Sequence, residues 1–164
     1  MQKEGFTLIE LLIVIAIIGI IMIAMFIALN PLLRFQHSRD AVRWQEVSEM
    51  LTAIKVDQID NDGEYMAVIE QMSTSTVYLI GTCVNGATAV DITNYCDVNP
   101  AVTACINFVG FLTEGYMGSL PVSPAGAKEW TSEFSGYTIE KRDNGTLFLR
   151  ACESEQADEI VLSR

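Results

Sequence analysis

The sequence has little of what an enzyme needs. It contains one histidine, His37, and lacks the GxSxG, HExxH and P-loop patterns. None of its four cysteines lies in a CxxC pair or a Cys/His zinc spacing. We interpret His37 as a solvated helix residue. We therefore predict that the chain is not an enzyme and has no catalytic residues, metal site or cofactor.

Positive charge is also scarce. The chain has 10 Lys and Arg against 21 Asp and Glu, a formal net charge of −11. Residues 57–164 alone carry sixteen acidic and five basic side chains. Because such a surface repels a phosphate backbone, we expect no general nucleic-acid binding by this part of the chain.

Residues 11–29 lack any charge, and the only polar side chains in residues 6–29 are Thr7 and Glu10. The run is long enough to cross a bilayer as a helix. It is too long for the apolar core of a secretory signal peptide, and no A-x-A cleavage site follows it. A plain signal anchor explains the length of the run but leaves Glu10 unexplained.

Glu10 is unusual because it is the one charged side chain in this apolar run. A carboxylate in the middle of a lone membrane helix costs about 2.5–3.5 kcal/mol, and a position near the end, as here, costs less. An incidental charge could reach the headgroups by extending along the helix. The other interpretation is a functional carboxylate that receives a cationic partner when subunits assemble.

The hexapeptide GFTLIE at residues 5–10, followed by the long apolar run, closely resembles the start of type IV pilins and type II secretion pseudopilins, which carry a class III leader. The resemblance implies that a prepilin peptidase cleaves after Gly5 and that Phe6 is then N-methylated. It also implies that Glu10 meets the freed amine of a neighbouring subunit, in a homopolymer built by membrane-bound pilus assembly machinery. Burial strengthens the attraction between two such charges.

Orientation in the membrane is read from two conflicting signals. Lys3 precedes the span while Arg34, Arg39 and Arg43 follow it, so the positive-inside rule alone places the C-terminal domain in the cytoplasm. We give more weight to the leader and to the cysteines, which place that domain outside.

All four cysteines follow the apolar run: Cys83, Cys96, Cys105 and Cys152. We expect two disulfides formed in an oxidising compartment, with all three pairings open. Cys83 and Cys96 lie in residues 81–104 and Cys105 follows directly, and we expect this region to form a stapled surface lobe.

Two residues weaken the N-terminal helix. Pro31 removes a backbone hydrogen bond and crowds the preceding turn, and Gly19 costs about 1 kcal/mol relative to alanine. We expect a kink or an unwound stretch between them. Family filaments contain a segment that melts on assembly, and Gly19 matches that pattern. The usual proline of the family lies earlier, where this chain has Ile27.

After the span, apolar residues recur at Val47, Met50, Leu51 and Ile54, which predicts an amphipathic helix over residues 42–59. The helix should end near Asp60, where a DNDG sequence predicts a turn. This string lacks the twelve-residue frame of an EF-hand calcium loop.

The rest of the chain predicts short strands at residues 76–80, 136–142, 146–152 and 159–162. A DNG hairpin signal lies between the middle two, and a short helix is expected at residues 104–112. A long helix followed by an antiparallel meander, with the apolar face of the sheet packed on the helix, is an α+β fold.

The expected organisation is a cleaved leader at 1–5, a membrane or filament-core helix at 6–30, an amphipathic helix at 31–60 and an extracytoplasmic head at 61–164. The main hypothesis is a structural subunit of a type IV pilus-like filament, held in the cytoplasmic membrane as a precursor and polymerised outside. A type II secretion pseudopilin is the first alternative. The second is a monomeric binding module on a signal anchor.

Overall fold

The computed structural model describes residues 5–83, 96, 104–126 and 128–164. The chain forms two compact units, Met1–Phe35 and Gln36–Arg164. Of the expected leader, only Gly5 belongs to the described residues. Most of the expected lobe at 81–104 also lies outside them.

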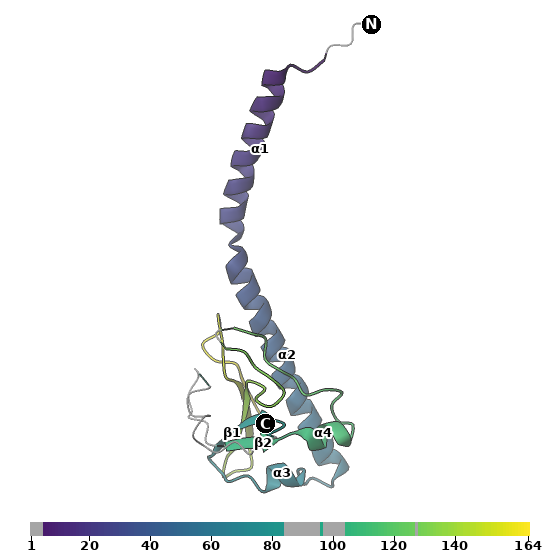
Figure 1. The fold of residues 1–164 in the computed structure, drawn as a ribbon. Helices are drawn as coiled ribbons and strands as arrows, with labels where there is room; N and C mark the ends of the chain where they lie inside the picture. Colours follow the sequence, from purple (N-terminus) through teal and green to yellow (C-terminus); the bar gives the residue numbers. More distant parts are fainter. Residues whose placement is uncertain (1–4, 84–95, 97–103, 127) are drawn as a thin grey trace. The chain divides into compact units, whose positions relative to one another are not determined.

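In the first unit, helix α1 spans Leu8–Leu29 and buries none of its residues (Figure 1). Its 22 residues correspond to about 33 Å at 1.5 Å per residue, close to the roughly 30 Å of a bilayer core. By length and composition it qualifies as a membrane-spanning helix. A helix that is apolar on all sides requires a non-aqueous environment.

The helix is interrupted at Asn30, which adopts a left-handed conformation with φ 38° and ψ 70°. The next residue, Pro31, opens helix α2 (Pro31–Asp60). Proline disfavours helical geometry in the residue before it but suits the first position of a helix. Arg34 Nε donates to the carbonyl of Leu29 at 3.3 Å, which satisfies one of the freed acceptors of α1. The kink predicted near Pro31 is confirmed.

In the second unit, α2 forms one side of the core of the head. Seven of its residues are buried at intervals of one, three or four, as expected for one face of a helix: Asp40, Arg43, Val47, Met50, Ala53, Ile54 and Asp57. The helix ends at Asp60, as predicted, in a turn where Asp62 and Gly63 have φ of 56° and 99°. Asp62 is one of the few non-glycine residues with positive φ, which aspartate tolerates.

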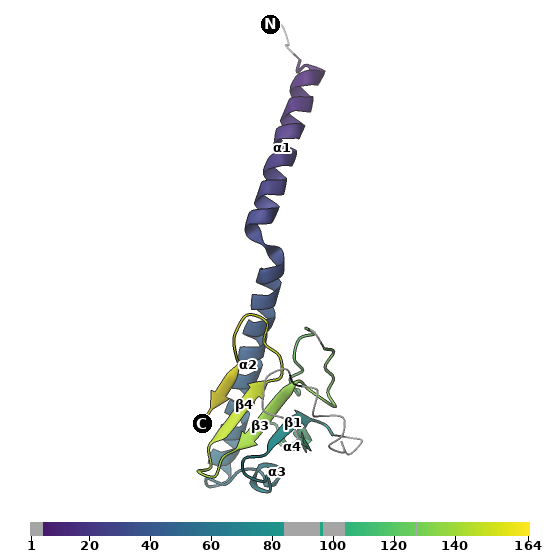
Figure 2. The same ribbon diagram turned by 90° about the vertical axis from the view of Figure 1, so that its left-hand side faces the viewer.

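Five strands form one sheet in the order β2-β1-β3-β4-β5. Figure 2 shows its three middle strands, β1, β3 and β4, side by side. Their bounds are β1 Val77–Gly81, β2 Ala104–Asn107, β3 Tyr137–Lys141, β4 Leu147–Ala151 and β5 Val161–Ser163. The three pairs β1–β3, β3–β4 and β4–β5 are antiparallel, whereas β1 and β2 are parallel. Gly145, with φ 81°, supplies the positive φ of the predicted DNG hairpin between β3 and β4. The α+β prediction is confirmed.

The helix predicted at residues 104–112 is wrong in its first part. Residues Ala104–Asn107 form β2, and only Val109–Thr113 form a helix, α4. β2 pairs with β1 along the register Tyr78↔Ala104 to Gly81↔Asn107. This pairing is a long-range contact that four residues of local sequence do not encode. A further short helix, α3 (Ala67–Glu70), was not predicted.

The sheet has apolar residues on both faces. One face shares a core with α2 that includes Met50, Ile54, Phe108 and Ile139. The other holds a smaller cluster made by Val77, Leu79, Trp130 and Cys152. A Cβ at Gly81 would lie 1.9 Å from the carbonyl oxygen of Glu133, so glycine is required where that loop crosses β1.

Candidate functional site

Thr7 and Glu10 form a capping box at the start of α1. The Thr7 backbone N–H donates to Glu10 Oε2 at 2.8 Å, and the Thr7 hydroxyl donates to the same oxygen at 2.7 Å. In return, the backbone N–H of Glu10 donates to Thr7 Oγ1 at 3.3 Å. These bonds satisfy donors that the first turn of a helix otherwise leaves free.

The peptide bond between Gly5 and Phe6 lies just before this cap. Residues 5–7 belong to no helix or strand, and the Phe6 side chain is 88% exposed. A Cβ built on Gly5 would have no atom within 4 Å. Gly5 and Phe6 are therefore both exposed in the described part of the chain.

Gly19 lies inside a continuous helix, whereas Pro31 lies next to a break between two helices. Helix α1 is continuous through Gly19, and the helical ladder is interrupted only next to Pro31, at Asn30. Since both ends of the expected weak stretch are described, the structure locates the break at its C-terminal end. Melting at Gly19 on assembly remains a prediction.

Comparison with known families supports the N-terminal assignment. Residues 1–26 match the prokaryotic N-terminal methylation motif. No curated protein and no solved structure significantly matches the chain. The N-terminal segment is therefore similar to that of a type IV pilin-like or pseudopilin-like prepilin, in agreement with the resemblance at residues 5–10.

Within the head, a buried arginine organises a cluster of charges. Arg43 on α2 has no exposed surface. Its Nη1 donates to Asp40 at 2.8 Å and to Glu155 at 3.0 Å, and its Nη2 lies 3.4 Å from Glu153. It also donates to Ser123 Oγ at 3.1 Å and to the carbonyl of Pro124 at 3.0 Å. The single guanidinium thus joins α2 to two separate loops.

Asp40 holds the C-terminal loop through its backbone. Its carboxylate accepts hydrogen bonds from the N–H groups of Glu155, Gln156 and Ala157, the shortest at 2.7 Å from Gln156. Burial of Asp40 opposes its ionisation, but these N–H groups and Arg43 outweigh it and lower the pKa of Asp40. The pKa of Glu155 is lowered by its hydrogen bond from Arg39 and by Arg43.

One buried carboxylate oxygen in the cluster accepts no hydrogen bond from the described residues. Glu153 Oε2 accepts from the indole N–H of Trp130 at 3.2 Å, whereas Oε1 is buried with no hydrogen-bond partner among the described residues. Nearby, the Tyr137 hydroxyl donates to Glu46. Burial raises the pKa of Glu46 despite this bond. In the ion pairs around Arg43, the three carboxylates of Asp40, Glu153 and Glu155 meet the two guanidinium groups of Arg39 and Arg43.

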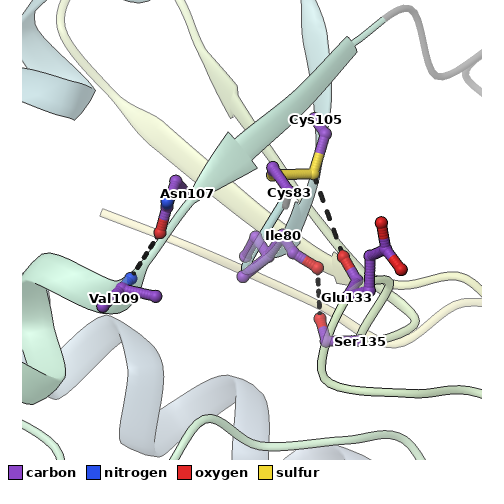
Figure 3. Close-up of a disulfide and its surroundings, with 7 residues drawn as sticks. All are labelled: Ile80, Cys83, Cys105, Asn107, Val109, Glu133 and Ser135. Atoms are coloured by element: carbon purple, nitrogen blue, oxygen red, sulfur yellow. Dashed lines mark hydrogen bonds between the residues drawn. A yellow bond between two sulfur atoms is a disulfide. The ribbon is translucent and has the colours of Figure 1, made fainter. Parts of the chain in front are cut away.

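The disulfides are Cys83–Cys105 and Cys96–Cys152. The first joins the chain just after β1 to the neighbouring strand β2, and the Cys105 sulfur lies 4.0 Å from the carbonyl oxygen of Glu133 (Figure 3). The second joins Cys96 to the end of β4. The prediction of two disulfides is confirmed, and the structure selects one of three pairings.

Other residues singled out in the sequence do not converge on a reaction centre. His37 is exposed and lines a cavity of about 280 Å³ with Trp44 and Gln156. Over the described part of the chain, no three His, Cys, Asp or Glu side chains are placed to hold a metal ion. The larger groove, about 520 Å³, runs along Ser48, Thr52 and Val56 of α2 opposite Tyr116 and Met117.

Two parts of these sites were missed in the sequence. The string T-L-I-E at residues 7–10 fits the S/T-x-x-E capping-box signature before an apolar run. Asp40 and Arg43 lie on the same buried helix face as Val47 and Met50, at intervals of three or four residues. Two opposite charges at such positions indicate an internal ion pair. Their partners in the C-terminal loop lie more than 100 residues away, so sequence spacing cannot identify them.

Proposed function

We propose that the chain is a structural subunit of a type IV pilus-like filament. It waits in the cytoplasmic membrane with its head outside, is cleaved after Gly5 by a prepilin peptidase and is N-methylated on Phe6. The N-terminal helices then bundle in the filament core, with Glu10 paired to the amine of a neighbouring subunit.

The observation that carries this proposal is helix α1, which begins inside the methylation motif at residues 1–26 and runs on to Leu29. Its 22 residues bury nothing within the chain, and Glu10 is its only charged residue. In the precursor, lipid covers this surface; in a filament, the helices of neighbours do so. Both environments disfavour an unpaired carboxylate, which supports a cationic partner for Glu10.

Processing tests the first half of the proposal. Mass spectrometry of subunits purified from filaments should show Phe6 as the first residue, with one added methyl group. A matched Gly5→Leu variant should remain at full length in the membrane. Filaments built from chains that still begin at Met1 would contradict the proposal.

The methylation motif also fits a pseudopilin of a type II secretion system. The two functions differ in their product, since a pilin forms long surface fibres and a pseudopilin forms a short periplasmic fibre that supports secretion. Electron microscopy of cells, combined with an assay of secreted proteins after deletion of the chain, distinguishes them. Extended surface fibres that vanish on deletion, with secretion unchanged, are the result expected for a pilin.

A further inference from the structure

Arg34 follows the break between α1 and α2 and is a cation without an acidic partner in the described part of the chain. Four other arginines each pair with a carboxylate: Arg39, Arg43, Arg142 and Arg150. Arg34 is exposed and forms no such pair with a described residue. Its charge is therefore available to a partner outside the chain.

The guanidinium of Arg34 uses only part of its hydrogen-bonding capacity. Its Nε donates to the carbonyl of Leu29 at 3.3 Å. Arginine has five N–H donors, so the four on Nη1 and Nη2 remain, and none of them bonds to a described residue. Such donors can bond two oxygens of one phosphate or carboxylate group at once. The bond to Leu29 holds them beside the end of α1.

The length of α1 places Arg34 at the surface of a bilayer. The 22 residues of α1 correspond to about 33 Å, against roughly 30 Å for the hydrocarbon core, so the core ends near Leu29. Five further residues extend a helix by about 7.5 Å, which is close to the headgroup layer of about 5–8 Å on each side. Arg34 therefore lies at the depth of the lipid phosphates.

The neighbours of Arg34 are apolar side chains that a membrane can cover. Leu32, Leu33 and Phe35 are 63%, 40% and 64% exposed. Apolar residues beside a basic one suit the boundary between acyl chains and headgroups, where the apolar part enters the lipid and the cation reaches outward. The segment thus combines a phosphate-binding donor set with apolar contacts for acyl chains.

We propose that Arg34 binds the phosphate group of an anionic phospholipid in the outer leaflet of the membrane. The exposed apolar neighbours favour a lipid over a water-soluble phosphate, because they need acyl chains beside them. This inference rests on the proposed function only in requiring that α1 spans the membrane; it needs neither the Glu10 pair nor a filament.

The charge of the rest of the chain confines this attraction to Arg34. Residues 57–164 carry sixteen acidic and five basic side chains, which an anionic surface repels. A carboxylate of a neighbouring subunit is the competing partner, since the same donors can bind it. The lipid is favoured because it already surrounds the end of α1 in the precursor, before any neighbour is present.

Quenching of a tryptophan by brominated lipids tests the inference on the full-length precursor in vesicles, without cleavage or assembly. A Phe35→Trp substitution places the fluorophore next to Arg34, and a Trp44→Phe background removes an exposed tryptophan. Trp130, only 8% exposed in the head, adds a constant signal. Mixtures of phosphatidylglycerol and phosphatidylcholine, with one or the other brominated, give the relative affinity of the two lipids at this position.

We expect this reporter chain to prefer phosphatidylglycerol about fivefold, the factor that one basic residue near an anionic surface supplies. Arg34→Gln should remove the preference. The matched control Arg142→Gln removes an exposed arginine that already pairs with Glu140, and it should keep the preference. Raising the salt from about 0.1 M to about 1 M shortens the screening length from about 10 Å to about 3 Å and should weaken the preference.

The other outcomes overturn the inference, and they differ in what else they overturn. Equal preference in Arg34→Gln and the reporter chain, or equal quenching by both lipids, leaves the membrane span intact and defeats only the lipid site. Absence of quenching by either lipid defeats the span as well, and with it the proposed function. An unchanged lipid preference in Arg34→Gln, together with fewer filaments, would identify a carboxylate of a neighbouring subunit as the partner instead.

Discussion

Replacing Arg43 by methionine removes the cation that joins α2 to the C-terminal loop. Methionine fills a similar space, so the change mainly removes charge and donors. Asp40, Glu153 and Glu155 would keep their negative charges but lose the guanidinium that they share, while Glu155 would still pair with Arg39. Breaking a buried ion pair by removing one partner costs about 3–5 kcal/mol. Because a domain is stable by about 5–15 kcal/mol, the loss should be large.

The matched control is Arg142→Met. Arg142 also pairs with a carboxylate, Glu140, at 2.8 Å, but its side chain is 48% exposed. It also stacks over Phe148 with its guanidinium carbon 4.7 Å from the ring centroid. Glu140 is buried, but it keeps its pair with Arg150 at 2.8 Å when the exposed Arg142 is replaced. The loss should therefore be close to the roughly 0.2–1 kcal/mol of a surface pair, and the control should unfold nearly as the parent chain does.

Urea unfolding of the full-length chain in detergent, with both disulfides intact, measures the difference. Trp130 is a suitable fluorescent reporter because its indole N–H donates to Glu153 inside the cluster. A Trp44→Phe background removes the second, more exposed tryptophan, which is 38% exposed. The expected result is a difference of about 3 kcal/mol or more between Arg43→Met and Arg142→Met. Equal unfolding free energies in the two variants would refute the role assigned to Arg43.

Three further predictions concern the head. Cys152→Ser opens a disulfide that spans 56 residues and should lower the free energy of unfolding by about 4 kcal/mol. Cys83→Ser opens one that spans 22 residues and should lower it by about 3 kcal/mol. Urea unfolding under oxidising conditions tests this, and the reverse order would contradict the loop argument. The pKa values of Asp40 and Glu155 are lowered in the folded chain. The stability that the two carboxylates contribute is therefore complete above their ordinary pKa values of about 3.9 and 4.3, and it is lost as the pH falls through their folded-state values. The urea midpoint should fall in acid, and a midpoint unchanged from about pH 6 to about pH 2.5 would exclude this contribution. Gly81→Ala should lower the thermal midpoint by several degrees because its Cβ would lie 1.9 Å from a backbone oxygen, and an unchanged midpoint would show that the loop can move away.

The parts of the fold that were predicted from sequence are those set by local pattern. The uncharged run gave α1, the three-and-four spacing gave α2, and the Asp-Asn-Gly string gave the hairpin between β3 and β4. In each case the sequence pattern lies in the same short segment as the helix or hairpin that it predicts. The break next to Pro31 was predictable for the same reason, since proline acts on the residue immediately before it.

The parts that were missed depend on distant contacts. β2 is a strand because it lies beside β1 and is tied to the chain that follows β1 by the Cys83–Cys105 disulfide. Arg43 is buried because loops more than 70 residues away supply its partners. The Cys83–Cys105 pairing likewise follows from the contact between β1 and β2 rather than from cysteine spacing.

At the N-terminus, the roles of Gly5, Phe6 and Glu10 are predictions from a resemblance to a processed family, and all three residues lie within the methylation motif at residues 1–26. The sequence also carried the Thr7 capping signal. The structure adds the direction of the Glu10 side chain, with one oxygen bonded to Thr7 and the other open.

The most direct test is a cryo-EM structure of filaments purified from cells that express this chain. We predict that the Glu10 carboxylate lies within about 4 Å of the amino group of Phe6 in a neighbouring subunit, inside a bundle of α1 helices, as an ion pair requires. A carboxylate that faces water, or that lies far from the amino terminus of every neighbouring subunit, would contradict the account.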